Sequence, residues 1–272
     1  FNDFSLQPHE VTWRAPLTTP KGLVRGPQTA LVTGPAGEEI YTDEHGRIKI
    51  QFHWDRQGKY DDKSSCWVRV AQVWAGNGYG TMFIPRIGME VVVDFLEGDP
   101  DQPIVTGCVY NGVNKPPYAL PANATRSTLK TLSSKGGGGT NELRFEDKKG
   151  SEEVFLQAEK DLNVNVKASR HEGIGGNADT KIHGYGRTWI EGEHDQKVDG
   201  DSNTTVKGDF FLGSNADLQL HCEQEMRVIG NNQVSISTPV AMDIYGGMKL
   251  VIEADTLISL KVGGSGIVID PS

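Results

Sequence analysis

The sequence predicts an all-β protein in which a small antiparallel barrel precedes a long β-helix shared by three chains. Glycine occupies 33 of 272 positions, well above its usual share of roughly 7%, and it separates short stretches rich in β-branched residues. The first part of the chain alternates apolar and polar residues with period two, as strands do. The last hundred or so residues repeat aliphatic side chains every eight positions. These observations indicate many short strands joined by many turns.

The first segment, residues 1–25, is predicted to be an extended connector. Pro8, Pro16 and Pro20 interrupt it among scattered aromatic residues, and proline removes a backbone donor wherever it stands. We expect this segment to be the tail of a missing domain that precedes it.

The second segment, residues 26–113, is predicted to be a barrel. Residues 47–54 alternate apolar and polar side chains, and Val91, Val93 and Phe95 share one parity, so one face of each strand is expected in the core. Gly34-Pro35 and Asp99-Pro100 mark turns. About five or six strands in this length are typical of a small antiparallel barrel of the OB type.

The third segment, residues 114–150, is predicted to be a flexible link. It is rich in proline at first, and residues 136–139 are four consecutive glycines. Glycine-rich stretches of this kind behave as flexible connections.

The fourth segment, residues 151–272, carries the eight-residue repeat. An aliphatic ladder is followed two residues later each time by a glycine, which we expect at a turn. The ladder is Ile174, Ile182, Ile190, Val198 and Val206, and the glycines are Gly176, Gly184, Gly192, Gly200 and Gly208.

After Val206 the register slips by six residues and a second ladder begins. Because six is an even number, the inward parity of the side chains is preserved. The second ladder is Leu212, Leu220, Val228, Ile236, Ile244, Ile252, Leu260 and Val268, with apolar companions two residues earlier at Leu218, Met226, Val234, Met242, Leu250 and Ile258. Each octad is therefore expected to be a short strand whose apolar face fills a common core.

One octad cannot fold alone. Burying two aliphatic side chains gives roughly 3–6 kcal/mol, whereas ordering eight residues of backbone costs roughly 8–16 kcal/mol. The backbone of each octad must therefore pair with layers above and below it.

Two architectures could provide that pairing. A single-chain, three-sided β-helix would use about three octads per turn and repeat most strongly at that longer period. An intertwined trimeric β-helix, a triangular prism, moves each chain one face onward per octad, so that symmetry makes every corner equivalent. One glycine per octad favours the prism, since glycine suits a corner that needs positive φ or close chain approach.

Several segments resemble VgrG, the spike-tip family of bacterial type VI secretion. They are GEEIYTDEHGRIKIQFHWD at residues 37–55, CWVRVAQVWAG at 66–76, IPRIGMEVVVDFLEGDPDQP at 84–103 and GCVYNG at 107–112. Residues 141–162, NELRFEDKKGSEEVFLQAEKDL, are similar to the start of the same family's β-helix.

The resemblance implies an OB-fold domain followed by a trimeric β-helix, related to the central spike of contractile phage tails. It implies a homotrimeric structural protein that pierces a target membrane and carries effector proteins. A missing upstream hub domain would contact the Hcp tube, and a PAAR-type cap would bind the C-terminal end. The spike would assemble in the bacterial cytoplasm and be translocated into a target cell without a signal peptide.

No residue is predicted to perform chemistry, and no cofactor is expected. The Ser, His and Asp residues form no nucleophile-elbow motif, and the glycines at 136–139 lack the Lys and Ser/Thr of a phosphate loop. His194 shares the inward parity, so three copies could meet on the axis and bind a metal ion or an anion. A corner position for His194 is equally open.

Charge and composition bear on partners and compartment. The net charge of −9, without a basic stripe, argues against nucleic-acid binding. Most of the aromatic residues Phe52, Trp54, Trp67 and Trp74 are predicted to lie in the core or in an interface. The cysteines Cys66, Cys108 and Cys222 are predicted to be buried, reduced thiols.

Two other functions remain open. A polysaccharide-active single-chain β-helix would be a monomer with a groove of clustered acids or aromatic residues. An OB-fold module that binds a carbohydrate or another ligand on a β-helical stalk would be separated from a spike only by binding assays.

Overall fold

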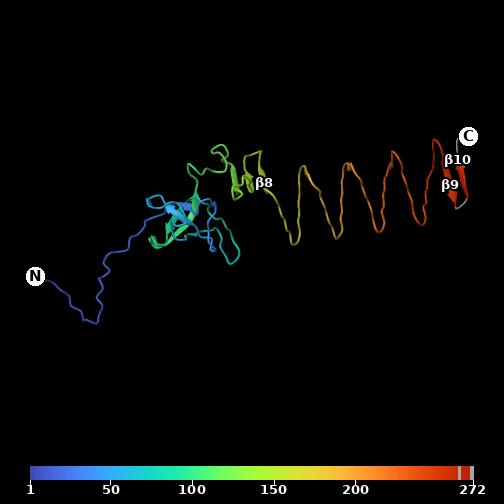
Figure 1. Ribbon diagram of the computed structural model, residues 1–272. Coiled ribbons are helices and arrows are strands. Elements are labelled where there is room, and N and C mark those ends of the chain that lie inside the picture. The colour runs from blue at the N-terminus through green and yellow to red at the C-terminus, as the bar shows by residue number, and fades with distance from the viewer. Residues whose placement is uncertain (263–264, 270–272) are drawn as a thin grey trace. The chain divides into compact units, whose positions relative to one another are not determined.

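The computed structural model describes residues 1–262 and 265–269. Its described part contains strands and one short 3-10 turn, η1 (Leu96–Gly98), but no α-helix, which confirms the predicted all-β class. The chain divides into two units, Phe1–Ala178 and Asp179–Ser272, and Figure 1 labels strands in both.

Five strands of the first unit form a sheet in the order β2-β1-β4-β5-β3. Neighbouring strands are antiparallel except β3 and β5, which are parallel. A bridge between Ile48 and Val68 joins the two edges of the sheet through reciprocal backbone hydrogen bonds of 2.9 Å. The predicted barrel is therefore confirmed, with one parallel pair as its exception. Its strands are β1 (Gln28–Thr33), β2 (Lys49–Phe52), β3 (Arg69–Val70), β4 (Glu90–Phe95) and β5 (Pro103–Val109).

The barrel core follows the alternation of the sequence. Successive side chains of a strand point to opposite faces, so every second residue of β4 reaches the interior. The same parity brings Ile48 and Ile50 inside, whereas Trp54 lies past the end of β2 and is exposed. The core consists of Ala30, Val32, Ile48, Ile50, Val68, Val91, Val93, Phe95 and Val105.

A second sheet occupies part of the segment predicted as a link. Strands β6 (Arg126–Lys130), β7 (Glu142–Glu146) and β8 (Glu153–Gln157) form an antiparallel meander. The prediction of a flexible link over residues 114–150 is wrong for β6 and β7. The four glycines lie in the loop between these two strands. They indicate flexibility for that loop alone and not for the whole segment.

The loop between β6 and β7 is attached to the barrel. Glu39 accepts hydrogen bonds from Ser134 Oγ at 2.7 Å and from the backbone N–H of Gly136 at 2.8 Å. Lys135 pairs with Glu38 at 2.9 Å, and Arg86 donates to the carbonyl of Leu132 at 2.8 Å. The second sheet is therefore held against the barrel by its own glycine-rich loop.

The second unit is a succession of extended segments separated by bends, which Figure 1 shows as a zigzag. It ends in a hairpin of β9 (Ile258–Val262) and β10 (Ser265–Ile269), paired antiparallel. Between its start and β9, the described residues of this unit contain no strand that is paired within the chain.

Candidate trimerisation interface

The backbone between β8 and β9 keeps a strict eight-residue rhythm. Two-residue bends begin at 159–160 and recur every eight residues to 255–256, with six extended residues between successive bends. Within the described part of the chain, residues 159–257 make no backbone–backbone hydrogen bond. A few backbone groups bond to side chains, as at Glu159 and Ala216. Because backbone N–H and C=O groups are obligatory hydrogen-bonding groups, the rest of this segment presents strand edges without backbone partners.

The predicted register slip after Val206 is not a slip of the backbone. The bends at 207–208 and 215–216 keep the spacing of eight. What changes is the place of the aliphatic residue in its segment: Val206 stands directly before a bend, whereas Leu212 stands three residues before the next one. The parity is preserved, as expected from an even displacement.

The ladder residues from Ile174 to Leu260 are exposed in the single chain. Their exposed fractions run from 46% for Val206 to 76% for Ile236. Soluble proteins rarely expose a contiguous apolar surface of this extent unless it is an interaction site. Some side chains of the opposite parity are more exposed still, such as Phe211 and Tyr245 with 88% and 90%, whereas Val251 is 49% exposed. The alternation of side chains along an extended segment places the ladder on one face of it, although the assignment of individual residues to a trimer core stays a prediction.

The five predicted turn glycines all stand at the second position of a bend. The positive φ offered as one reason for them is wrong, because none of the five has φ in the left-handed region. Apart from the glycine and its two neighbours in sequence, no atom of the same chain lies within 4 Å of a Cβ built at any of them. Close approach of another chain is the reason that remains for a glycine at these corners.

The predicted rungs at Leu260 and Val268 do not continue the ladder. They lie in β9 and β10, where Leu260 is opposite Ile267 and Val268 is opposite Ser259. In the sequence, Gly263 and Gly264 follow β9, and a Gly-Gly pair is typical of hairpins.

The candidate metal residue His194 is exposed and lies in the second unit. Among the described residues of one chain, no group of three or more His, Cys, Asp and Glu side chains could hold a metal ion. An axial site made of three copies of His194 stays a prediction.

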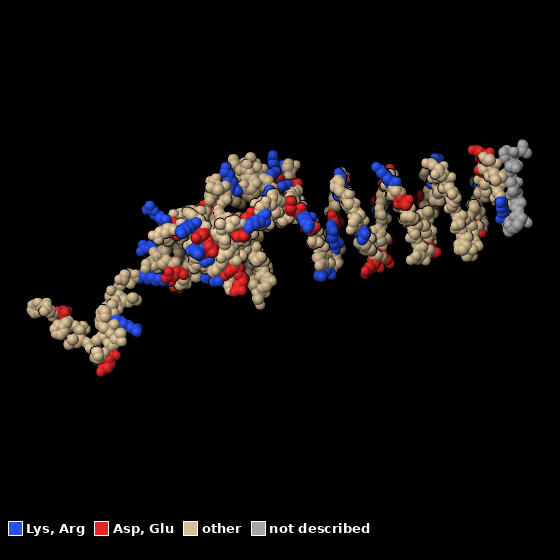
Figure 2. Space-filling view, in the orientation of Figure 1, with Lys and Arg blue, Asp and Glu red and all other residues tan. Residues whose placement is uncertain are grey.

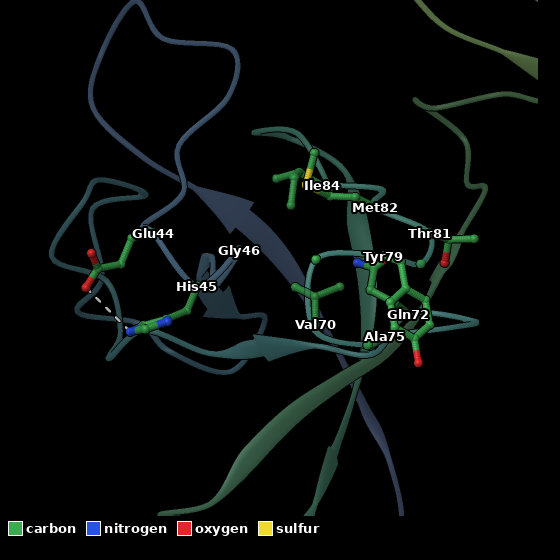
Figure 3. Close-up of a pocket in the computed structure, with 13 residues that line it drawn as sticks. Glu44, His45, Gly46, Val70, Gln72, Ala75, Tyr79, Thr81, Met82 and Ile84 are labelled. Carbon is green, nitrogen blue, oxygen red and sulfur yellow. Dashed lines mark ion pairs between the residues drawn. The ribbon is translucent and has the colours of Figure 1, made fainter.

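One hollow of the first unit lies under the hairpin around residues 74–81 and has a volume of about 590 Å³. Glu44 and His45 stand across it from Tyr79 and Thr81 (Figure 3). The Glu44 carboxylate and the His45 ring are 3.5 Å apart, and both side chains are mostly exposed. Water screens such a pair strongly, so this arrangement gives no reason to expect catalysis.

The aromatic predictions hold only in part. Phe52 stacks between Trp54 and Phe95, at 5.1 and 5.9 Å, and Trp67 packs on Tyr41 at 4.9 Å. Trp54 and Trp74 are exposed in this chain. A sequence pattern of period two gives parity but does not give the point at which a strand ends.

The prediction that all three cysteines are buried is wrong for the single chain. Cys66, Cys108 and Cys222 are free and exposed. Cys222 has the parity of the apolar ladder and stands in the same unpaired segment, so its burial would require another chain.

Positively and negatively charged side chains are mixed on the surface of the molecule. On the face shown in Figure 2, Lys and Arg are interspersed with Asp and Glu. No helix in the described residues is long and apolar enough to span a membrane.

Two families match separate parts of the chain. Residues 33–110 match the type VI secretion system/phage-baseplate injector OB domain, a range that contains β2 to β5 of the barrel and the last residue of β1. Residues 127–249 match the bacteriophage T4 gp5 C-terminal trimerisation domain, which covers the meander and most of the segment with eight-residue bends.

Three relatives illustrate the similarity to whole proteins. The type VI secretion system spike protein VgrG4b of Pseudomonas aeruginosa is 59% identical over 174 residues, which are 64% of this chain and 22% of the relative. VgrG1a of the same organism, also described as a spike protein, is 43% identical over 260 residues, 91% of this chain and 40% of the relative. The actin cross-linking toxin VgrG1 of Vibrio cholerae serotype O1 is 47% identical over 199 residues, 73% of this chain and 18% of the relative.

The chain thus spans less than half of the length of each of these relatives. The barrel and the octads match in the order that the sequence predicted, and the similarity extends through both. The chain belongs to the VgrG family of type VI secretion spike proteins, of which it contains the OB and trimerisation regions.

Proposed function

We propose that three copies of this chain form the shaft of a type VI secretion spike, whose role is mechanical. The observation that carries this proposal is the segment 159–257, which combines exposed aliphatic ladders with a backbone that is unpaired among the described residues. A strand with such edges needs partner strands of the same rhythm. Other copies of the chain have the same eight-residue spacing because their sequence is the same. Closed threefold symmetry would pair every strand edge with a neighbouring copy.

The arrangement explains why such a shaft would resist bending. Each layer would be hydrogen-bonded to layers of two other chains, so bending would break ladder hydrogen bonds on at least one face. The aliphatic ladders would meet on the axis and exclude water from it. The intertwining would leave no free monomer edge along the shaft.

The partners follow from the family resemblance. An upstream hub domain would join the shaft to the Hcp tube, and a PAAR-type cap would bind the C-terminal end. Effector proteins would be carried on the spike itself or on its cap. We assign the barrel to residues 26–113 and the β-helix to the residues from 151 on. The spike would assemble in the bacterial cytoplasm before it is driven through a target membrane.

We assign no enzymatic activity to this chain. The relatives that it matches are described mainly as spike proteins, and the toxin from Vibrio cholerae shares only 18% of its length with it. An activity that such a relative's name implies belongs to that whole protein.

Native mass spectrometry of the purified chain tests the proposal. The expected species is a trimer, with three times the mass of one chain. A stable, folded monomer would show that the octads close on themselves, as in a single-chain β-helix, and the spike proposal would then fail.

A further inference from the structure

The eight-residue rhythm determines which side chains of different copies become neighbours. In a threefold prism, one octad advances a chain by one face and one layer, so residue i of one copy lies directly above residue i+8 of another. Adjacent layers of a β-sheet are about 4.8 Å apart. Outward side chains eight residues apart in sequence therefore form columns on the outer faces, each layer contributed by a different chain.

One such column is charged with alternating sign. Asp179, Arg187 and Asp195 each stand at the third position after a bend, on the parity opposite to that of the aliphatic ladder. All three are exposed and lie in the second unit. No ion pair engages them within the described part of a single chain.

We propose that the Arg187 guanidinium of each copy pairs with Asp179 of one neighbouring copy and Asp195 of the other. A charge directly opposite its counter-charge on an adjacent strand stabilises the pairing, and arginine can engage two carboxylates through its several N–H donors. Three-fold symmetry repeats this column on all three faces. The proposal rests on the trimer of the proposed function and names residues that would join its chains.

In the single chain the Arg187 guanidinium lies close to two aromatic rings. Its guanidinium carbon lies 4.7 Å from the ring centroid of Tyr185 and 5.6 Å from that of Trp189. Both rings belong to the same extended segment and the same outer parity as Arg187. Cation–π contacts of this kind restrict the side chain, so less conformational freedom is lost when the carboxylates of other copies approach.

The column also distinguishes the correct alignment of the chains. The aliphatic ladder cannot do so between residues 174 and 190, because Ile174, Ile182 and Ile190 are the same residue type at the same position. If one chain shifted by an octad, the core would look unchanged there, but Arg187 of one copy would face Arg187 of another. Like charges opposite each other destabilise strand pairing, so the column disfavours the shift.

The neighbour relationship can be tested by disulfide formation between copies. In a full chain with Cys66, Cys108 and Cys222 replaced by alanine, Arg187→Cys with Asp195→Cys should give oxidised, covalently linked chains, since the layer spacing of about 4.8 Å suits a disulfide. Asp179→Cys with Asp195→Cys, two layers apart, should give none. Equal cross-linking of the two pairs, or cross-linking of the second pair alone, would overturn the proposal.

Charge variants test whether the column stabilises the trimer. Arg187→Glu should lower the melting temperature of the trimer, and the swapped triple variant Asp179→Arg, Arg187→Asp, Asp195→Arg should recover most of that loss. Lys249→Glu is the matched control, because it makes the same charge change beside uncharged Ala241 and Leu257 and should leave the melting temperature nearly unchanged. A triple variant that melts as low as Arg187→Glu, or a control that falls equally, would refute the ion column.

Native mass determines which claim has failed. If the parent chain is a trimer and the expected cross-link or recovery is absent, the column is wrong and the spike stands. If the parent chain is a monomer, the proposed function itself has failed.

Discussion

The hydroxyl of Tyr118 donates a hydrogen bond to Oε1 of Glu142, a residue 24 positions later in the chain. Glu142 is only 5% exposed, and it also accepts a hydrogen bond from Thr128 at 2.9 Å. The same hydroxyl accepts a hydrogen bond from Nη1 of Arg144 at 2.9 Å. Tyr118 therefore joins the segment before β6 to the middle of the meander.

Replacement of this tyrosine by phenylalanine should destabilise the first unit. Tyr118→Phe removes a donor from a buried carboxylate, which we expect to lower the free energy of unfolding by about 1.5 kcal/mol. Urea denaturation of the full chain, followed by tryptophan fluorescence, measures this change. Tyr110→Phe is the control, because Tyr110 is 64% exposed and should change the free energy by less than about 0.5 kcal/mol. Equal effects of the two substitutions would contradict the role given to the Tyr118 hydroxyl.

Glu146 should make the stability of the meander depend on pH. Hydrogen bonds from Thr125 and Arg126 lower the pKa of this carboxyl from 4.5 to about 2. Because the folded-state pKa is depressed, its contribution is complete above the unfolded pKa and is lost as the pH falls from about 4.5 toward 2. We expect Glu146→Gln to lower stability at pH 7 and to differ less from the parent chain at pH 2.5. Thermal melts at both values measure this, and a difference independent of pH would exclude the assignment.

Gly80 should be intolerant of a side chain. Its φ is +138°, and a Cβ at this position would lie 2.3 Å from the carbonyl oxygen of Trp74. Gly80→Ala should therefore lower the free energy of unfolding of the first unit by about 2 kcal/mol or more. A thermal melt of the variant should show a markedly lower melting temperature.

Gly78, in the same hairpin, is the control for backbone strain alone. Its φ is +78° and a Cβ there meets nothing within 4 Å, so Gly78→Ala should cost only about 1 kcal/mol. If the Gly78 substitution proved the more damaging of the two, the close approach at Trp74 would not be the reason for Gly80.

The sequence predicted elements whose pattern is local. Val91, Val93 and Phe95 alternate within six residues, and all three are buried in β4. The eight-residue repeat could also be predicted from the sequence, because successive octads carry an aliphatic residue at the same position.

Other features depend on contacts that no local pattern contains. The meander is not evident from the sequence because the buried Glu142 of β7 is satisfied by Tyr118, which lies outside the strands, and by Thr128 of β6. The bends at 207–208 and 215–216 keep the spacing of eight. The sequence does not predict this, because the aliphatic pattern shows where side chains repeat and not where the backbone bends. The exposure of Trp54 depends on where β2 ends, which hydrogen bonding decides.

The apolar ladder itself makes the strictest prediction. Ile244 has the inward parity of the ladder, whereas its neighbour Tyr245 is 90% exposed on the other side of the same segment. Ile244→Asp would place three carboxylates near the axis of the trimer, where an ionised group without a partner is very unfavourable. We expect the trimer to be destabilised by more than about 4 kcal/mol and to dissociate or melt far below the parent chain in native mass and thermal measurements. Tyr245→Asp adds the same charge one residue away and should leave the trimer intact, because its carboxylate would stay in water. If the Ile244→Asp variant and the Tyr245→Asp variant behaved alike, the two parities would not distinguish an axis from a surface. The threefold core would then have to be abandoned.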